Sequence, residues 1–366
     1  MKNRYWVTTS LLVLCVLFLN YLPACAENVN HVNLPAPIAP INGRLSMAIT
    51  FPGDGSQLDV DGFRRSYTTA KNLGVSLCTL YYMWSELESS QGNYSWGDLD
   101  FPMQLLAEQQ LRVSFILKII DTSQLGTYPK DLRFRTFDEP GFVRRLTRFV
   151  ETLLARYPSQ INYLWIGNEI DDYFVSHRDA IPAYKNLLSE VVRAVHAKYP
   201  GVKIGTISTY HDAKMQKALD VIEQTGTVGD IVGFSFYPQS ISGATPTTTE
   251  PYMQDMIAIA KRIRKPFLIT ETAWSAEGLG GSDAHQVEYL RDLFRIYRRY
   301  KDQMDVLGLF VLYDFPGSVN QDLAAQAGIQ GQEDFVRFTG SLGYAKNDGT
   351  PRPAWSALQE ELKKLK

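Results

Sequence analysis

Two glutamates in the sequence directly follow hydrophobic runs of the kind that form buried strands. Glu169 comes with Asn168 after the run Tyr163 to Gly167, and Glu271 comes after the run Pro266 to Thr270. An ionised carboxylate is costly in apolar surroundings, so a glutamate at such a place indicates a chemical use. Two carboxyl groups that face each other across a cleft fit the hydrolysis of a glycosidic bond, because one protonates the leaving oxygen while the other attacks the sugar or directs water.

Asn168 and Tyr237 have the side chains that such a pair of acids needs beside it. Asn168 can hydrogen-bond the 2-hydroxyl of a sugar, a contact that strengthens as positive charge develops on the ring. Tyr237 follows the run Ile231 to Phe236, which precedes the run that ends at Glu271. We therefore expect its phenol to donate to Glu271 and to keep that carboxylate ionised, while the neighbouring anion raises the pKa of Glu169 and keeps it protonated.

Eight strand-like runs alternate with helical patterns from residue 43 onward, with a repeat of about 37 residues, the size of one βα unit. The most regular 3.6-residue patterns lie at 142–157 and 184–195. A doubly wound sheet would need a glycine-rich dinucleotide turn after the first strand, and Phe51 to Gly55 does not provide one. The sequence thus predicts an α/β fold, a single (β/α)8 barrel over 43–366, with strands at 45–51, 75–82, 113–117, 163–167, 203–206, 231–236, 266–270 and 306–311.

The first 26 residues have the pattern of an export signal. Lys2 and Arg4 precede an apolar stretch, and Ala24 and Ala26 form a small-x-small cleavage pattern around Cys25. The alternative is a lipoprotein signal that ends before Cys25, with a lipid anchor on that cysteine. A proline-rich extended tether is expected at 27–42. The mature protein is therefore expected in the periplasm or the medium, or anchored by lipid to a bacterial membrane.

Composition narrows the classes of function further. With 45% hydrophobic and 21% charged residues the chain can form a full core, and its net charge of -2 without a basic stripe argues against nucleic acid as a partner. Two of the three cysteines, Cys15 and Cys25, lie in the predicted signal, so no internal disulfide framework is expected. The five histidines show no metal-binding spacing. We expect no metal and no cofactor, and the sequence implies no protein partner.

At this level of detail the chain resembles the retaining glycoside hydrolases of clan A. The resemblance rests on the segments 166–170, 234–238 and 270–274, which are most similar to those of endo-β-1,4-galactanases. It implies that Glu169 is the acid/base, that Glu271 is the nucleophile and that Tyr237 hydrogen-bonds the nucleophile. The segment 84–96 is instead similar to other families of the clan. The usual arginine of the second strand is missing, since that strand ends in Leu80-Tyr81-Tyr82.

Aromatic side chains after several strands are candidates for sugar binding, because flat rings pack against the apolar faces of sugars. The alternative for each of them is packing in the core. The predicted substrate-binding residues are Trp274, Trp84, Tyr313, Tyr82 and His211.

The sequence therefore predicts a retaining glycoside hydrolase that cleaves β-linked polysaccharides or oligosaccharides by double displacement. One alternative is a non-catalytic glycan-binding barrel, which would not require either glutamate. A second alternative is a lyase that forms a Schiff base through Lys118, at the end of the third predicted strand. Export argues against the lyase, since phosphorylated metabolites are mostly intracellular.

Overall fold

The computed structural model describes residues 45–53, 59–326 and 331–365. The predicted signal at 1–26, Cys25 and the predicted tether at 27–42 lie outside the described residues. Among the described residues, none of the helices has the length and apolar composition needed to cross a membrane.

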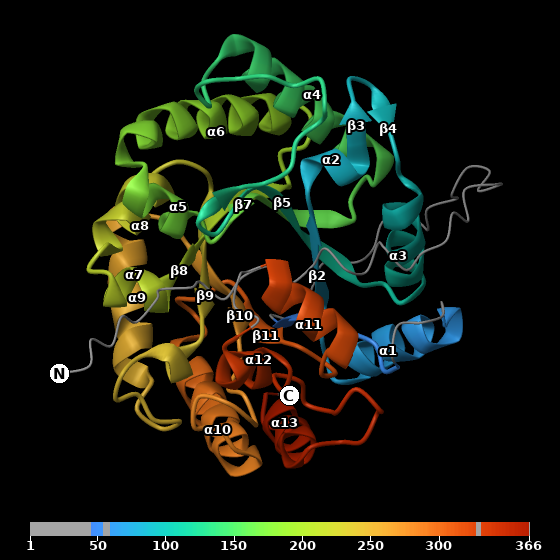
Figure 1. Cartoon of the computed structure of the whole chain (residues 1–366), viewed down its shortest axis with the longest axis vertical. Helices are drawn as coiled ribbons and strands as arrows, with labels where there is room; N and C mark the ends of the chain where they lie inside the picture. The colour runs from blue at the N-terminus through green and yellow to red at the C-terminus, as the bar shows by residue number, and fades with distance from the viewer. Residues whose placement is uncertain (1–44, 54–58, 327–330, 366) are drawn as a thin grey trace.

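Eight parallel strands form a closed barrel at the centre of the molecule (Figure 1). Each strand pairs with the next one in the chain, and the last strand pairs back with the first, Leu45 opposite Leu307. All eight correspond to the strands predicted from the sequence, so the prediction of a single (β/α)8 barrel is confirmed. The barrel strands are β1 (Leu45–Ala48), β2 (Leu77–Tyr82), β5 (Arg112–Asp121), β7 (Ile161–Asn168), β8 (Lys203–Thr209), β9 (Ile231–Phe236), β10 (Phe267–Thr272) and β11 (Leu307–Phe310).

Eight helices surround the strands as an outer layer (Figure 1). Each has an apolar stripe that faces the barrel; in α4, for example, Phe142, Leu146, Phe149 and Leu153 are all buried. The two helices with the most regular patterns in the sequence are confirmed. The layer consists of α1 (Val60–Asn72), α3 (Gly97–Glu108), α4 (Pro140–Arg156), α6 (Ile181–His196), α8 (Leu219–Gly226), α9 (Glu250–Ile263), α10 (Asp283–Tyr300) and α13 (Pro353–Lys363).

Short elements that the strand pattern did not predict lie between the barrel strands and the outer helices. Helices α5 (Ile170–Ser176) and α7 (Tyr210–Met215) directly follow β7 and β8, and α11 (Gly317–Gln326) and α12 (Glu333–Thr339) follow β11. A short strand, β6 (Gln124–Leu125), pairs antiparallel with the end of β5. These segments build the loops at the carboxyl ends of the strands, where barrel enzymes carry their sites.

A small hairpin follows β2 and is attached to the barrel through a buried ion pair. It contains α2 (Trp84–Leu87), β3 (Glu88–Ser90) and β4 (Asn93–Tyr94). Arg145 of α4 donates from Nε to Glu88 Oε1 at 3.0 Å, and the indole of Trp84 donates to Glu88 Oε2 at 2.8 Å. Both oxygens of this buried carboxylate are therefore satisfied, and the hairpin is held against α4.

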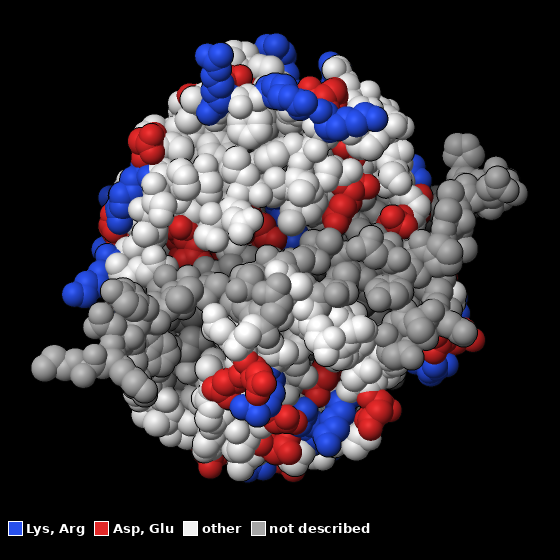
Figure 2. Space-filling view, viewed as in Figure 1, with Lys and Arg blue, Asp and Glu red and all other residues white. Residues whose placement is uncertain are grey.

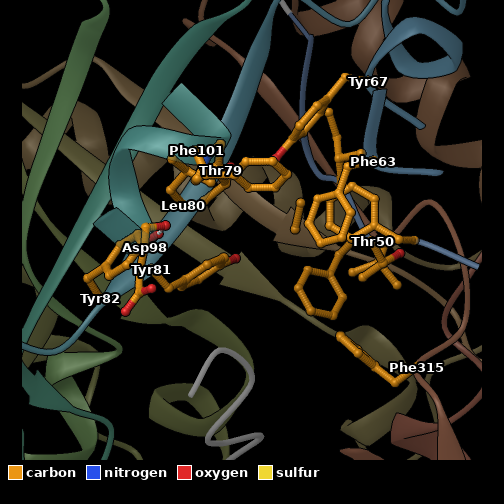
Figure 3. Close-up of a pocket in the computed structure, with 16 residues that line it drawn as sticks. Thr50, Phe63, Tyr67, Thr79, Leu80, Tyr81, Tyr82, Asp98, Phe101 and Phe315 are labelled. Atoms are coloured by element: carbon orange, nitrogen blue, oxygen red, sulfur yellow. Dashed lines mark hydrogen bonds between the residues drawn. The ribbon is translucent and has the colours of Figure 1, made fainter. Parts of the chain in front are cut away.

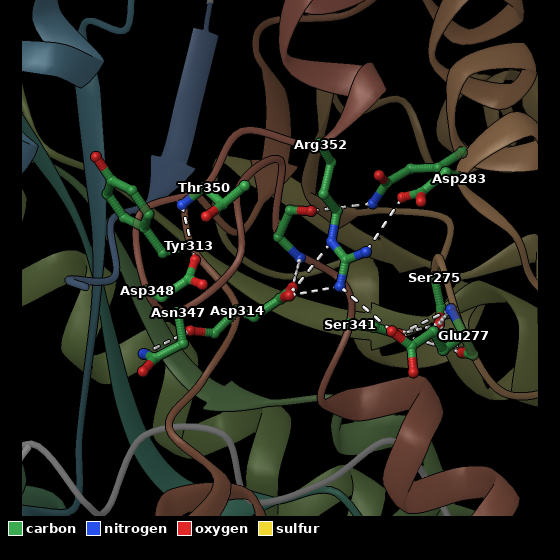
Figure 4. Close-up of polar contacts among 12 residues, drawn as sticks. Ser275, Glu277, Asp283, Tyr313, Asp314, Ser341, Asn347, Asp348, Thr350 and Arg352 are labelled. Atoms are coloured by element: carbon green, nitrogen blue, oxygen red, sulfur yellow. Dashed lines mark hydrogen bonds and ion pairs between the residues drawn. The ribbon is translucent and has the colours of Figure 1, made fainter. Parts of the chain in front are cut away.

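A second buried ion pair holds the C-terminal helix against the barrel (Figure 4). Arg352, just before α13, donates from Nη2 to Asp314 Oδ2 at 2.6 Å and from Nη1 to Asp283 Oδ1 at 3.1 Å. Arg352 and Asp314 are each 5% exposed. Burial raises the pKa of Asp314 to about 6, against the effect of the guanidinium. One arginine thus joins the loop after β11 to the starts of α10 and α13.

Replacing Arg352 by methionine should lower the free energy of unfolding by about 3 kcal/mol at neutral pH, because it leaves the Asp314 carboxylate buried without its cation. Chemical denaturation measures this loss. Arg337→Met is the matched control, since Arg337 pairs with Asp334 at the surface, where the two side chains are 58% and 57% exposed. The control should lose less than about 1 kcal/mol. Similar losses in the two variants would show that the buried pair is not important for stability.

Candidate active site

Three of the four residues that the sequence singled out for chemistry come together at the carboxyl ends of the strands. Glu169 directly follows β7, Tyr237 directly follows β9, and Glu271 lies near the end of β10. All three are buried, with exposed fractions of 1%, 0% and 5%. The Tyr237 hydroxyl donates to Glu271 Oε2 at 2.8 Å, as the order of the strands led us to expect.

Glu271 receives a second phenolic hydrogen bond that the sequence analysis did not predict. The Tyr81 hydroxyl, from β2, donates to Glu271 Oε1 at 2.5 Å. Each carboxylate oxygen of Glu271 thus has one tyrosine donor. The signal available in the sequence was the missing arginine, because Tyr81 lies at the end of the strand that was expected to carry it.

Glu169 has a different set of partners. Its Oε1 accepts from the Ser235 hydroxyl at 2.5 Å, and its Oε2 is buried without a partner among the described residues. Its backbone is left-handed, with φ of 49°, a conformation that is uncommon outside glycine. Glu169 is the single residue between β7 and α5, so the sharp change of chain direction itself holds the side chain at the barrel mouth.

The two carboxyl groups differ in how strongly their surroundings favour the proton. Burial raises the pKa of Glu169 well above its ordinary value, and the nearby charge of Glu271 adds to that rise. Burial also raises the pKa of Glu271, but the hydrogen bonds from Tyr81 and Tyr237 oppose it. The arrangement therefore favours a protonated Glu169 beside an ionised Glu271.

Asn168 and Lys118 are both tied to Asp121, at the end of β5. Asn168 Nδ2 donates to Asp121 Oδ1 at 3.1 Å, and Lys118 Nζ donates to Asp121 Oδ2 at 2.8 Å. Lys118 is buried in this ion pair. A Schiff-base lyase requires an unpaired buried amine as its nucleophile, so the pairing does not favour that alternative.

Two of the predicted sugar-binding aromatics lie elsewhere. Trp84 is 0% exposed, and its indole is used to hold Glu88. The expectation that it forms a sugar platform is not supported, because no face of the ring is accessible. Tyr313 packs against Trp355 of α13, with 6.4 Å between the ring centroids, so its ring faces the outer helices.

The other three predicted sugar-binding residues are also almost fully buried. His211 is buried, and its Nδ1 accepts from the Tyr237 backbone N–H at 3.4 Å. Burial lowers the pKa of His211 to about 3, so the ring is neutral and supports Tyr237. Trp274 follows β10 with 4% of its surface exposed, and its indole N–H has no partner among the described residues. Tyr82 donates to the Asp98 carbonyl at 3.0 Å.

An aromatic pocket adjoins Glu271 on the side of β1, β2 and β11 (Figure 3). Tyr81 forms part of its wall, so the pocket begins at a side chain that contacts the carboxylate. The other aromatic rings that line it are Phe51, Phe63, Tyr67, Tyr82, Phe101, Phe310 and Phe315. Rings around a recess next to two acids are suited to hold the apolar faces of sugars.

A group of buried aspartates lies near Glu169, in α5 and α7. Asp171 accepts from the Thr209 backbone N–H at 2.6 Å and so connects α5 to the end of β8. Burial raises the pKa of Asp172 and Asp212 to about 7, and both carboxyl groups add to the rise in the pKa of Glu169.

The described residues contain no group of histidine, cysteine or acidic side chains arranged to hold a metal. Most charged side chains of the face shown in Figure 2 lie toward its rim, with a few acidic groups near its middle.

Replacing Glu169 by glutamine should make the protein more stable at pH 8, with a gain that disappears toward pH 4. The pKa of Glu169 in the folded protein is raised above its ordinary value of 4.5, so the folded state loses stability as the pH rises and the buried group is forced to ionise. Glutamine does not ionise and avoids this loss. Each kcal/mol recovered should raise Tm by about 2 to 4 °C, measured by thermal unfolding across the pH range.

Glu360→Gln is the control for this measurement, because Glu360 pairs with Arg291 at the surface, where both side chains are 56% exposed. Its Tm difference from the wild type should be small and nearly independent of pH. A Glu169→Gln variant that is no more stable than the wild type at any pH would contradict the raised pKa.

Comparison with known proteins supports the chemistry suggested by this geometry. Residues 143–308, somewhat less than half of the chain, match the model of glycosyl hydrolase family 53. This segment includes Glu169, Tyr237 and Glu271. Comparison with curated proteins gives no significant match.

Several solved glycosidase structures share the fold. The exo-beta-1,4-mannosidase Op5Man5 from Opitutaceae bacterium strain TAV5 is 14% identical, with a TM-score of 0.66 over 88% of this chain and 59% of the mannosidase. A family 39 glycoside hydrolase from Bacteroides cellulosilyticus WH2 is also 14% identical, with a TM-score of 0.61 over 88% of this chain and 64% of that enzyme. The chain thus spans less than two thirds of either enzyme.

A GH5_18 enzyme from Streptomyces cattleya, solved in complex with Manb1-4GlcNAc, is covered more fully. It is 16% identical, with a TM-score of 0.66 over 88% of this chain and 81% of the enzyme. The family match, the closed barrel and the two glutamates after β7 and in β10 agree with one another. Residues 143–308 are similar to the enzymes of glycosyl hydrolase family 53, and the barrel as a whole has the fold of these solved glycosidases.

Proposed function

We propose that the protein cleaves β-glycosidic bonds by double displacement, with Glu271 as the nucleophile and Glu169 as the acid/base. The observation that carries this assignment is the unequal set of donors to the two carboxyl groups. Glu271 accepts one phenolic hydrogen bond on each oxygen, whereas Glu169 accepts a single hydroxyl, and its second oxygen has no partner within the part of the chain that the structure describes. The donors favour an anion at Glu271, and the apolar burial of Glu169 favours a proton.

In the first step a carboxylate oxygen of Glu271 attacks the anomeric carbon while Glu169 gives its proton to the leaving oxygen. The glycosidic bond breaks, and a glycosyl ester forms on Glu271. In the second step the Glu169 carboxylate takes a proton from water, the water oxygen attacks the same carbon, and the ester bond to Glu271 breaks. A non-catalytic barrel would need neither the donors nor the pair of acids.

Asn168 precedes Glu169 in the chain, and we assign it a role in binding the sugar. Its Nδ2 donates to Asp121, while its Oδ1 is buried without a partner among the described residues. We assign this oxygen to the 2-hydroxyl of the sugar at the cleavage site, whose proton becomes a better donor as positive charge develops on the ring. Trp274, Tyr82 and the rings of the aromatic pocket would contact neighbouring parts of the glycan.

The substrate class proposed is a β-linked polysaccharide or oligosaccharide. The match to family 53 and the similarity of the site motifs to those of endo-β-1,4-galactanases make β-1,4-galactan the first substrate to test. The mannosidase named above and the structure with Manb1-4GlcNAc make β-mannosides the second. The export pattern at 1–26 supports action in the periplasm or outside the cell, with lipidation of Cys25 as the alternative to release.

Incubation with a panel of β-glycans, followed by proton NMR of the first products, tests the proposed reaction. Two displacements at one carbon restore its configuration, so the first-formed sugar should have the β configuration before mutarotation. A first-formed α sugar would show single displacement and would contradict the role of Glu271. No hydrolysis of any member of the panel would contradict the proposed substrate class.

Replacing Glu169 by alanine should spare the first step on aryl glycosides with good leaving groups and slow the second step strongly. Added azide should then accelerate turnover by about 10-fold or more, because azide attacks the glycosyl ester without needing a base. The product should be a β-glycosyl azide. Glu271→Ala is the matched control, since azide in place of the nucleophile should give the α-glycosyl azide. Absence of an azide effect in Glu169→Ala would remove that residue from the mechanism.

A further inference from the structure

We propose that Tyr81 is a positioning residue for Glu271, and that two neutral phenols, those of Tyr81 and Tyr237, together orient this carboxylate and hold it ionised. This inference rests on the proposed function for its catalytic consequence. The hydrogen bond itself is tested without any substrate.

The geometry shows why Tyr81 is suited to this role. Tyr237 comes from β9, the strand next to β10, whereas Tyr81 comes from β2, which is separated from β10 by β1 and β11. The two hydroxyls therefore reach Glu271 from different parts of the barrel and bind different oxygens, at 2.5 and 2.8 Å. One donor on each oxygen restrains rotation of the carboxylate and also stabilises its negative charge.

The effects of the charged groups around Glu271 largely oppose one another, so the two phenols are its main stabilising contacts. Lys118 lowers the pKa of Glu271, and Asp121 raises it. These two side chains form an ion pair with each other at 2.8 Å, so their effects on Glu271 largely oppose one another. Glu169, whose pKa is raised by burial and by the charge of Glu271, is favoured in its protonated form. An arginine would have supplied a permanent charge here, whereas Tyr81 supplies a hydrogen bond alone.

The ring of Tyr81 also forms part of the wall of the aromatic pocket (Figure 3), so the test variant must keep the ring. Replacement by phenylalanine does so and removes the hydroxyl alone. The ring is buried and would be retained, so the shape of the pocket should change little. Tyr184→Phe is the matched control. Its ring is 0% exposed, and its hydroxyl donates to the Ile166 carbonyl in β7, so that variant also loses one buried hydroxyl contact.

The first experiment measures Tm against pH for both variants. Without the Tyr81 hydroxyl the ionised form of Glu271 loses a donor, so its pKa in the folded protein rises. The Tyr81→Phe variant should therefore lose more stability at high pH, where Glu271 is ionised, than at low pH, where it is protonated. In a Glu271→Gln background this pH dependence should disappear. The Tyr184→Phe loss should be nearly constant with pH.

The second experiment measures the pH dependence of hydrolysis on the substrate found in the glycan panel. Tyr81→Phe should lower kcat by about 10- to 100-fold with little change in KM, as expected for one hydrogen bond to a charged group. The acidic limb of the pH–rate profile should move upward by about one pH unit, because Glu271 must be ionised to attack. Tyr237→Phe should shift the limb in the same direction, and Tyr184→Phe should not shift it.

Each outcome has a separate meaning. A Tyr81→Phe stability loss that is constant with pH, or that keeps its pH dependence without Glu271, would overturn the proposed hydrogen-bond role. A normal pH–rate profile in Tyr81→Phe would overturn its link to catalysis. Activity retained in Glu271→Ala would overturn the proposed function, while the pH-dependent stability of Tyr81→Phe would still identify the hydrogen bond.

Discussion

Two buried carboxyl groups at one end of the barrel are the constraint on which the site depends. Glu169 and Glu271 are both almost fully buried, and a pair of ionised acids at that depth would be strongly unfavourable. Both phenols donate to Glu271, whereas one oxygen of Glu169 has no hydrogen-bond partner in the described ranges of the chain. The same unequal distribution that makes the pair tolerable also separates the roles of nucleophile and acid.

Much of the fold could be predicted because buried parallel strands appear in the sequence as short hydrophobic runs. Each predicted strand overlaps a barrel strand, although β5 continues to Asp121, beyond its predicted end at Leu117. That extension contains Lys118 and Asp121, whose charges suggest a loop, yet their mutual ion pair allows them to remain in a buried strand. The hairpin after β2 was not predicted as a structural unit, since its strands are only two and three residues long.

The site was predictable where a residue type and its place along a strand were sufficient, as for Glu169, Tyr237 and Glu271. It was not predictable where a side chain faces a partner from a distant part of the sequence. Tyr81 and Glu271 are 190 residues apart, and the sequence shows only that the second strand lacks its usual arginine, not which side chain takes its place. Trp84 shows the opposite error, because an aromatic residue after a strand has the same pattern whether it faces a sugar or, as here, the buried Glu88 carboxylate.

The pairing of the first strand with the last affects how the protein can fold. Leu45 lies opposite Leu307, so the ring closes only when nearly the whole chain is in place, and such distant contacts carry a large loop-closure cost and slow folding. Until then β1 and β11 each present an unpaired edge to which other chains can add. Because Glu271 takes one donor from β2 and the other from β9, on opposite sides of this closure, the nucleophile acquires both hydrogen bonds only after the ring has closed.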